Sequence, residues 1–357
     1  MTSQKDQRRH AIAELEELAD RPLTAGQIFR RADEVLRPVL GYDGVCWHGT
    51  DPATGLVTSV LTDDLRLEDF RQAVELEIWT QDVTQFADLR RGGLVADSLT
   101  RATRGRPGDS RRFREQIAPA GFGDELRVLF EAAGAAWGCA AFMRAPDRGA
   151  YRVGEVALAR RAARSLGTAL RHSQMRAAGT PAGGHPPAVL LLDSRNRVVR
   201  ADDRAEVLLG EIADDAVGAF EVPTSLLMAV EQARAAKAAA GVPPRLRVRT
   251  HAGAWLVLNT SIMGGGADHL AAVVITPANA DDVLPVVFAT YGLTAREREV
   301  AVQVLRGRDT REIARALSLK PLTVQDHLKS VFTKAGVRSR RDLVAGLVAS
   351  RVPEILD

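Results

Sequence analysis

The side chains whose types and spacing suggest chemistry lie between Pro321 and about Lys334, where polar and apolar residues divide by helical face. At 100° per residue, the apolar residues form one stripe that would pack inward. These are Val324, Leu328, Val331, Phe332 and Ala335. The outer face lacks the Glu–Lys pairs of an ordinary solvated helix and offers short hydrogen-bonding groups and a cation: Thr323, Asp326, Lys329, Ser330 and Thr333, with Gln325 at its margin.

Such a face suits the major groove of double-stranded DNA. A Gln side chain can pair with adenine, a Lys with guanine, and an Asp can accept a hydrogen bond from the amino group of cytosine. Gln325, Asp326 and Lys329 are therefore the candidate base contacts. Phosphate contacts are expected from the neighbouring polar and basic groups Thr323, Ser330, Lys334, Arg338 and Arg340.

The elements that must position this face are marked by helix start signals. Three pairs have the three-residue spacing of a reciprocal N-terminal cap: Thr294 and Glu297, Asp309 and Glu312, and Ser339 and Asp342. Pro321 can occupy the first position of a further helix, because the N–H that it lacks has no partner there. The sequence therefore predicts a module of four short helices from Tyr291 to about Glu354.

The run LTAREREVAVQVLRGRDTREIARALSLKPLTVQDHLKSVFTKAGVRSRRDLV, Leu293 to Val344, resembles the LuxR-type helix-turn-helix along its whole length. The resemblance implies that Glu297 and Glu299 fix the first helix, that Ile313 and Ala314 belong to the scaffold helix, and that Thr323 to Lys329 is the recognition segment. Where many members have Thr-Val-Lys, this chain has Gln325 in place of the Lys, followed by Asp326. A common cationic contact is thus replaced, and base preference should differ accordingly.

The resemblance also implies that the final helix, Arg340 to about Ser350, pairs two such modules. Its apolar stripe is more than one small module could bury completely: Leu343, Val344, Leu347 and Val348. A symmetric homodimer would require an inverted-repeat operator. The alternative interpretation of the whole C-terminal module is a three-helix core that does not contact DNA.

Charge is distributed in agreement with DNA binding. Residues 290–357 carry 13 Lys and Arg against 8 Asp and Glu, a net +5, whereas the rest of the chain carries 35 against 37, a net −2. The basic surplus is thus concentrated in the final fifth of the chain, as neutralisation of phosphate requires.

Length and composition limit what the rest of the chain can be. A chain of 357 residues suggests two or three domains, and 46% hydrophobic residues is ample for packed cores. Cys46 and Cys139 lie in apolar, strand-like runs, which favours buried reduced thiols over a disulfide. A polar N-terminus and the lack of 18 consecutive apolar residues predict a cytoplasmic protein with no membrane segment.

The sequence divides at a Gly- and Pro-rich linker, residues 176–187. Before it, the order helix, hairpin, helices, hairpin and helix resembles a GAF domain, with a sheet of the six-stranded type. After it, a five-strand meander with helices between strands two and three resembles a PAS domain. We expect an α+β multidomain chain: a GAF-like domain at 1–175, the linker, a PAS-like domain at 188–277, a connector at 278–290, and an all-α LuxR-type domain at 291–357.

Other residues suggest ligand sites or chemistry less specifically. Trp47, Trp79, Phe86 and Trp137 could line a pocket for an apolar effector, although plain core packing is the favoured explanation. His48 and Cys46 share one strand face without further ligands at metal spacing, so no metal site is expected. The run ending at Asp193 is similar to the phosphorylated strand of receiver domains, but the segment predicts a β-hairpin instead. No catalytic motif is found, which argues against an enzyme.

These observations lead to one main hypothesis. The chain is expected to be a homodimeric, sequence-specific transcription regulator in which an unknown small-molecule effector alters operator binding. No cofactor is implied, and RNA polymerase is a further candidate partner. The alternatives are a constitutive DNA-binding dimer with purely structural N-terminal domains and a phosphorylation-driven response regulator.

Overall fold

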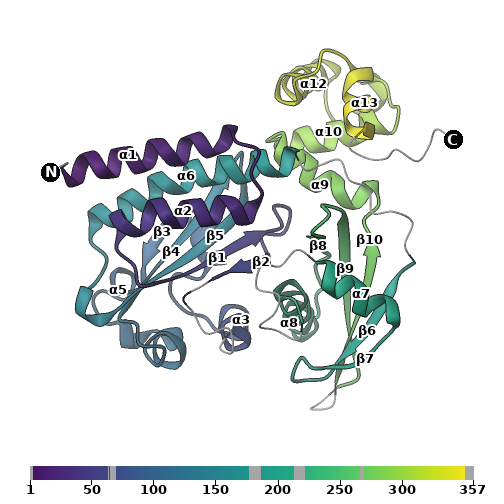
Figure 1. The fold of residues 1–357 in the computed structure, drawn as a ribbon. Coiled ribbons are helices and arrows are strands. Elements are labelled where there is room, and N and C mark those ends of the chain that lie inside the picture. The colour runs from purple at the N-terminus through teal and green to yellow at the C-terminus, as the bar shows by residue number, and fades with distance from the viewer. Residues whose placement is uncertain are drawn as a thin grey trace.

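The computed structural model describes residues 3–62, 64, 70–176, 186–212, 222–265 and 269–349. Two sheet domains lie side by side, and a helical lobe formed by the C-terminal segment sits above them (Figure 1). The expected linker at residues 176–187 falls mostly outside the described residues.

The first sheet has the strand order β2-β1-β5-β4-β3, and every neighbouring pair is antiparallel. Its strands are β1 (Gly44–Thr50), β2 (Val57–Leu61), β3 (Ala96–Ser98), β4 (Asp124–Ala132) and β5 (Ala135–Arg144). Both predicted hairpins, β1–β2 and β4–β5, are confirmed. The expectation of a sheet of the six-stranded type is not met within the described residues, where the sheet has five strands.

Three long helices cover one face of this sheet: α1 (Gln4–Glu17), α2 (Ala25–Leu40) and α6 (Val153–Arg176). Trp47 alternates onto this face and is almost completely buried. Its ring stacks with Phe29 and Phe130, with centroids 5.6 and 5.8 Å away, and meets Phe142 edge-on. This aromatic cluster anchors α2 on the sheet.

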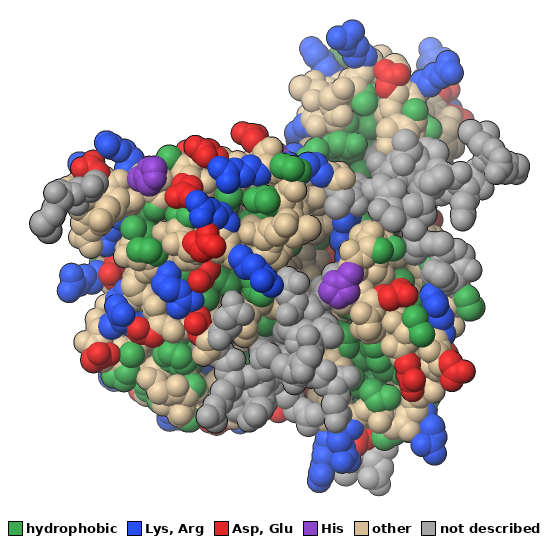
Figure 2. Space-filling model, in the orientation of Figure 1, with side chains coloured by type: hydrophobic (Ala, Val, Ile, Leu, Met, Phe, Trp, Pro, Cys, Tyr) green, Lys and Arg blue, Asp and Glu red, His purple; other side chains and the backbone are tan. Residues whose placement is uncertain are grey.

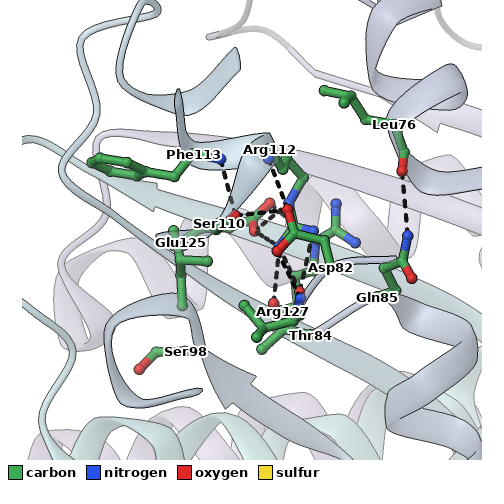
Figure 3. Close-up of polar contacts among 12 residues, drawn as sticks. Leu76, Asp82, Thr84, Gln85, Ser98, Ser110, Arg112, Phe113, Glu125 and Arg127 are labelled. Carbon is green, nitrogen blue, oxygen red and sulfur yellow. Dashed lines mark hydrogen bonds and ion pairs between the residues drawn. The ribbon is translucent and has the colours of Figure 1, made fainter. Parts of the chain in front are cut away.

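Shorter elements pack over the opposite face or connect the strands. They are α3 (Phe70–Trp79), α4 (Phe86–Arg91), α5 (Leu99–Ala102), the 3-10 turns Leu18–Asp20, Pro107–Asp109 and Pro146–Arg148, and a π-turn at Phe113–Ile117. A buried ion network holds this region together (Figure 3). The Glu125 carboxylate accepts from Arg112 at 2.8 Å and from Arg127 at 3.1 Å, and Arg127 also reaches Glu77 on α3. Burial would raise the pKa of Glu125, but the two guanidinium groups lower it.

The second sheet, β7-β6-β10-β9-β8, repeats the strand order of the first when its strands are counted along the chain. Its elements are β6 (Ala188–Leu192), β7 (Val198–Ala201), α7 (Asp203–Glu211), α8 (Thr224–Ala238), β8 (Leu246–Arg249), β9 (Trp255–Met263) and β10 (Leu270–Pro277). The predicted five strands with helices between the second and third are confirmed, but their order is not that of a meander, because β6 pairs with β10 and β7 and β8 lie at opposite edges. Asp193 lies in the β6–β7 turn, where it accepts from the backbone N–H groups of Arg195 and Arg197, so the predicted hairpin is also confirmed.

The two sheet domains share one apolar core. Helix α8 packs on β9 and also on α3 and β2 of the first domain. Cys46 and Cys139, buried as expected, lie in the same cluster as Leu226 and Val230 of α8. Polar contacts also cross this boundary, because the Trp79 indole N–H donates to Glu231 at 2.8 Å and Arg247 pairs with Asp51 at 3.1 Å.

We predict that Glu125→Gln lowers the free energy of unfolding by about 3–5 kcal/mol, because it leaves two guanidinium groups buried without their shared carboxylate. Urea unfolding followed by tryptophan fluorescence measures this loss. Glu115→Gln is the matched control, since its partner Arg111 is 54% exposed and such surface pairs contribute little to stability. Equal losses in the two variants would contradict the structural role given to the buried network.

Candidate nucleic-acid interface

The C-terminal lobe is built from α9 (Ala280–Thr290), α10 (Ala295–Leu305), α11 (Thr310–Ala316), α12 (Pro321–Ala335) and α13 (Arg340–Ala349). Reciprocal caps at Thr294–Glu297 and Asp309–Glu312 start α10 and α11, as predicted. Pro321 is the first residue of α12, and the Ser339 hydroxyl accepts from the backbone N–H of Asp342 at 3.1 Å. The four start signals read from the sequence are therefore confirmed.

The apolar stripe of α12 forms the centre of this lobe. Val324, Leu328 and Val331 are buried against residues from α10, α11 and α13, while Phe332 and Ala335 are partly buried beside them. The connection from α11 to α12 is tight and places Ser318 at a φ of 54°. Gly336 ends α12 in the left-handed conformation that glycine adopts without steric cost.

The opposite face of α12 is open to solvent. Gln325, Asp326 and Lys329, the candidate base contacts, are all exposed, and Thr323 is half-buried next to them. Lys and Arg side chains gather on the outer surface of this lobe (Figure 2). The geometry thus offers hydrogen-bonding groups on the outside of a helix whose other face is fixed by its core.

Two predicted phosphate contacts already have partners inside the lobe. The Ser330 hydroxyl donates to Glu297 at 2.6 Å, and the Lys334 ammonium lies 2.6 Å from the same carboxylate. Burial would raise the pKa of Glu297, but these two bonds and the amide of Thr294 lower it to about 2. Glu297 therefore clamps α12 to the start of α10 in addition to capping α10.

Arg340 and Arg338, two other predicted phosphate contacts, differ in how they are held within the lobe. Arg340 donates to the Arg308 carbonyl and to the Thr310 hydroxyl, both at 2.7 Å, so it ties α13 to the start of α11. Arg338, in the short connection between α12 and α13, is exposed.

The predicted dimerisation residues lie on α13. Leu343 is 1% exposed and belongs to the core of its own lobe, and Val344 packs partly against that core. The side chains of Leu347 and Val348 lie outside the described residues. Part of the predicted dimerisation stripe of α13 thus packs in the core of its own lobe.

The four aromatic residues predicted to line a pocket are not brought together. Trp47 is in the aromatic cluster beneath α2, whereas Phe86 lies across the sheet, 6.0 Å from the His48 ring. Trp79 is 48% exposed at the boundary with α8, and Trp137 is buried with its indole N–H on the Ala132 carbonyl. Trp47 and Trp137 are on strands and share the core beneath α2 and α6, whereas Trp79 and Phe86 are on the helices α3 and α4 outside that core.

The sequence analysis predicts a connector at residues 278–290. The segment 278–290 is not a plain connector but contains α9, whose Leu284, Val287 and Phe288 belong to the core of the lobe. Asn279 and Asp282 form the same reciprocal cap as the later helices, so the three-residue spacing could have revealed it.

Among the residues that the structure describes, no group of three or more His, Cys, Asp or Glu side chains could hold a metal ion. No helix in the described part of the chain is both long and apolar enough to cross a membrane.

The fold and the exposed helix face define a protein with two antiparallel-sheet domains and a C-terminal helix-turn-helix. Residues 292–346 match the family model "Bacterial regulatory proteins, luxR family". This segment is a LuxR-type helix-turn-helix domain.

Comparison with solved structures gives weak overall likenesses. SdiA of Escherichia coli aligns over 96% of each chain with 12% identity and a TM-score of 0.35. The VqmA–ligand–DNA complex of Vibrio cholerae aligns over 48% of this chain and 87% of VqmA, with 18% identity and a TM-score of 0.22. The DhaR(N)–DhaL complex of E. coli aligns over 77% of this chain and 89% of its counterpart, with 13% identity and a TM-score of 0.25. A search of curated proteins finds no match.

The Glu297 clamp predicts a specific loss of stability in acid. Its folded pKa of about 2 lies below the ordinary carboxyl value, so its contribution is complete above about pH 4.5 and is lost as pH falls towards 2. Thermal unfolding of the wild type and of Glu297→Gln should therefore differ most near neutral pH, and the difference should shrink below about pH 4.5 and be lost near pH 2.

Glu299→Gln is the control for this prediction. Glu299 is 49% exposed and pairs with Arg296 on the surface of α10, so its removal should have little effect at any pH. A difference between wild type and Glu297→Gln that stays constant down to about pH 2 would contradict the ionised clamp.

Proposed function

We propose that the protein is a homodimeric, sequence-specific transcription regulator that binds DNA through α12 and senses a small molecule with its N-terminal domains. The observation that carries the DNA-binding part is the exposure of Gln325, Asp326 and Lys329 on the open face of α12, within the segment that matches the luxR family. These side chains can hydrogen-bond to base edges in a major groove.

The departure from a more basic recognition segment has consequences for binding. With Gln325 and Asp326 beside Lys329, attraction to phosphate is weaker on this face, and discrimination rests more on base edges. Phosphate contacts would come from Thr323 and the exposed Arg338. Ser330, Lys334 and Arg340 would add contacts from positions already fixed by bonds inside the lobe.

The assembly and its partners follow from the same domain. We propose that α13 pairs two lobes through the residues of its stripe that the core leaves available, so that the operator is an inverted repeat. RNA polymerase is the expected protein partner of such a regulator, and the cytoplasm its compartment.

The domain assignments rest on element order. In the first domain, helices, hairpin, helices, hairpin and a long final helix support a GAF-like module at 1–175. In the second, five antiparallel strands with α7 and α8 between the second and third support a PAS-like module at 188–277.

Lys329→Ala tests the role of α12 most simply. If Lys329 reads a base, its removal should cost roughly 1–3 kcal/mol of operator binding, and unevenly across operators that differ at single positions. The operator is first selected from randomised duplexes, and dissociation constants are then measured by fluorescence anisotropy at fixed salt.

The matched control is Lys5→Ala, since Lys5 is an exposed lysine on α1 at the far end of the molecule. It should leave all dissociation constants unchanged. An equal loss on every operator would reduce Lys329 to a phosphate contact, and no loss would remove α12 from the DNA interface.

A further inference from the structure

Leu322 is an exposed apolar residue in the first turn of α12. Its side chain is 69% exposed, whereas the other Leu, Ile, Val and Phe side chains described in the lobe are buried or half-buried. An isolated apolar residue on a protein surface needs no explanation by itself. Leu322 is distinguished by the residues around it.

Leu322 lies in the middle of the face that carries the candidate base contacts. At about 100° per residue, it is about 20° from Lys329 around the helix axis, and Gln325 and Asp326 lie to either side at about 60° and 40°. Leu322 is one turn from Gln325 and Asp326, and all four side chains are exposed. A base edge that meets this face would therefore meet an apolar group between hydrogen-bonding groups.

The position of Leu322 along the helix also suits contact with DNA. It is the second residue of α12, which begins at Pro321. Helical side chains incline toward the N-terminus of their helix, so Leu322 extends toward the start of α12. In helix-turn-helix proteins the N-terminal residues of the recognition helix contact the base edges.

The major groove offers such a side chain one apolar group, the C5-methyl group of thymine. The other groups that the bases present there are hydrogen-bond donors and acceptors. Contact with one of these would displace its water without replacing the hydrogen bond, which is unfavourable. Contact with the methyl group removes apolar surface from water on both sides, so thymine is the base that a leucine favours.

We propose that Leu322 is a specificity-determining residue, which selects a thymine in each operator half-site by packing on its C5-methyl group. Gln325, one turn further along the helix, can pair with the adenine of a neighbouring base pair, so the first turns of α12 favour A·T pairs. This inference rests on the proposed binding of DNA through α12 and adds the base that the helix prefers.

The test removes the methyl group from the DNA. Once the wild-type chain has selected an operator, each thymine of one half-site is replaced in turn by deoxyuridine, which lacks only the C5-methyl group. One of these replacements should weaken binding about fourfold, the effect of one buried methyl group. The dissociation constants are measured with the full chain by fluorescence anisotropy at fixed salt.

Leu322→Ala should bind the thymine operator about fivefold more weakly than the wild type does, and should bind the thymine and deoxyuridine operators equally. Leu322→Met keeps a long apolar side chain and should keep the preference for thymine. Circular dichroism checks that both variants are folded, which the exposure of Leu322 favours.

Two further variants separate Leu322 from its surroundings. Val242→Ala removes an apolar side chain that is 91% exposed between α8 and β8, and should leave every dissociation constant unchanged. Thr323→Ser removes only the methyl group of the next residue along α12. Whatever its effect on overall affinity, the ratio of the thymine and deoxyuridine dissociation constants should stay as in the wild type.

The inference is overturned if the selected operator contains no thymine, or if every deoxyuridine operator binds as tightly as the thymine operator. It is also overturned if folded Leu322→Ala keeps the preference for thymine, or if Thr323→Ser loses it. Failure of the wild-type chain to select any operator would refute the proposed DNA binding, and this inference with it.

Discussion

Helix α8 packs between the two sheet domains and joins them. Residues Thr224–Glu231 of this helix are all buried, because one side faces β9 and the other faces α3 and β2. Glu231 would be costly to bury alone, but it accepts from Trp79 and from Asn196 at 2.8 Å and pairs with Arg234. The two sheet domains are thereby joined into one body.

The DNA-binding lobe is attached to this body through α9. Ala289 of α9 belongs to the core beneath α6, while Leu284 and Phe288 belong to the core of the lobe. A helix shared by two cores transmits displacement, since close-packed interiors yield little to deformation. The orientation of α12 is therefore tied to the sheets through packing as well as through Arg171 and Arg247, which donate to backbone carbonyls of α9.

The sequence predicted local structure well and long-range contacts poorly. Helix starts at Thr294, Asp309 and Pro321 follow from caps and proline geometry, which are local, and the hairpins follow from alternation and turn residues. The spread of Trp47 and Phe86 onto opposite faces needed the strand register and the packing of α4. The pairing of Asp51 with Arg247 joins residues 196 positions apart, and no local pattern encodes such a contact.

In the candidate site, too, local features were predictable and long-range contacts were not. Helical periodicity predicted the exposed face of α12, because the buried apolar stripe determines which side of the helix faces solvent. The contacts of Glu297 with Ser330 and Lys334 join two helices, so the residue pattern of α12 alone does not predict them.

The proposed function depends above all on the recognition of bases by the open face of α12. The most direct measurement is the selection of duplexes from a randomised pool by the full chain and by Gln325→Lys. Gln pairs with adenine and Lys with guanine, so the sequences that the variant selects should change from adenine to guanine at one position of each half-site. Identical selected sequences for the two proteins would contradict base recognition by α12.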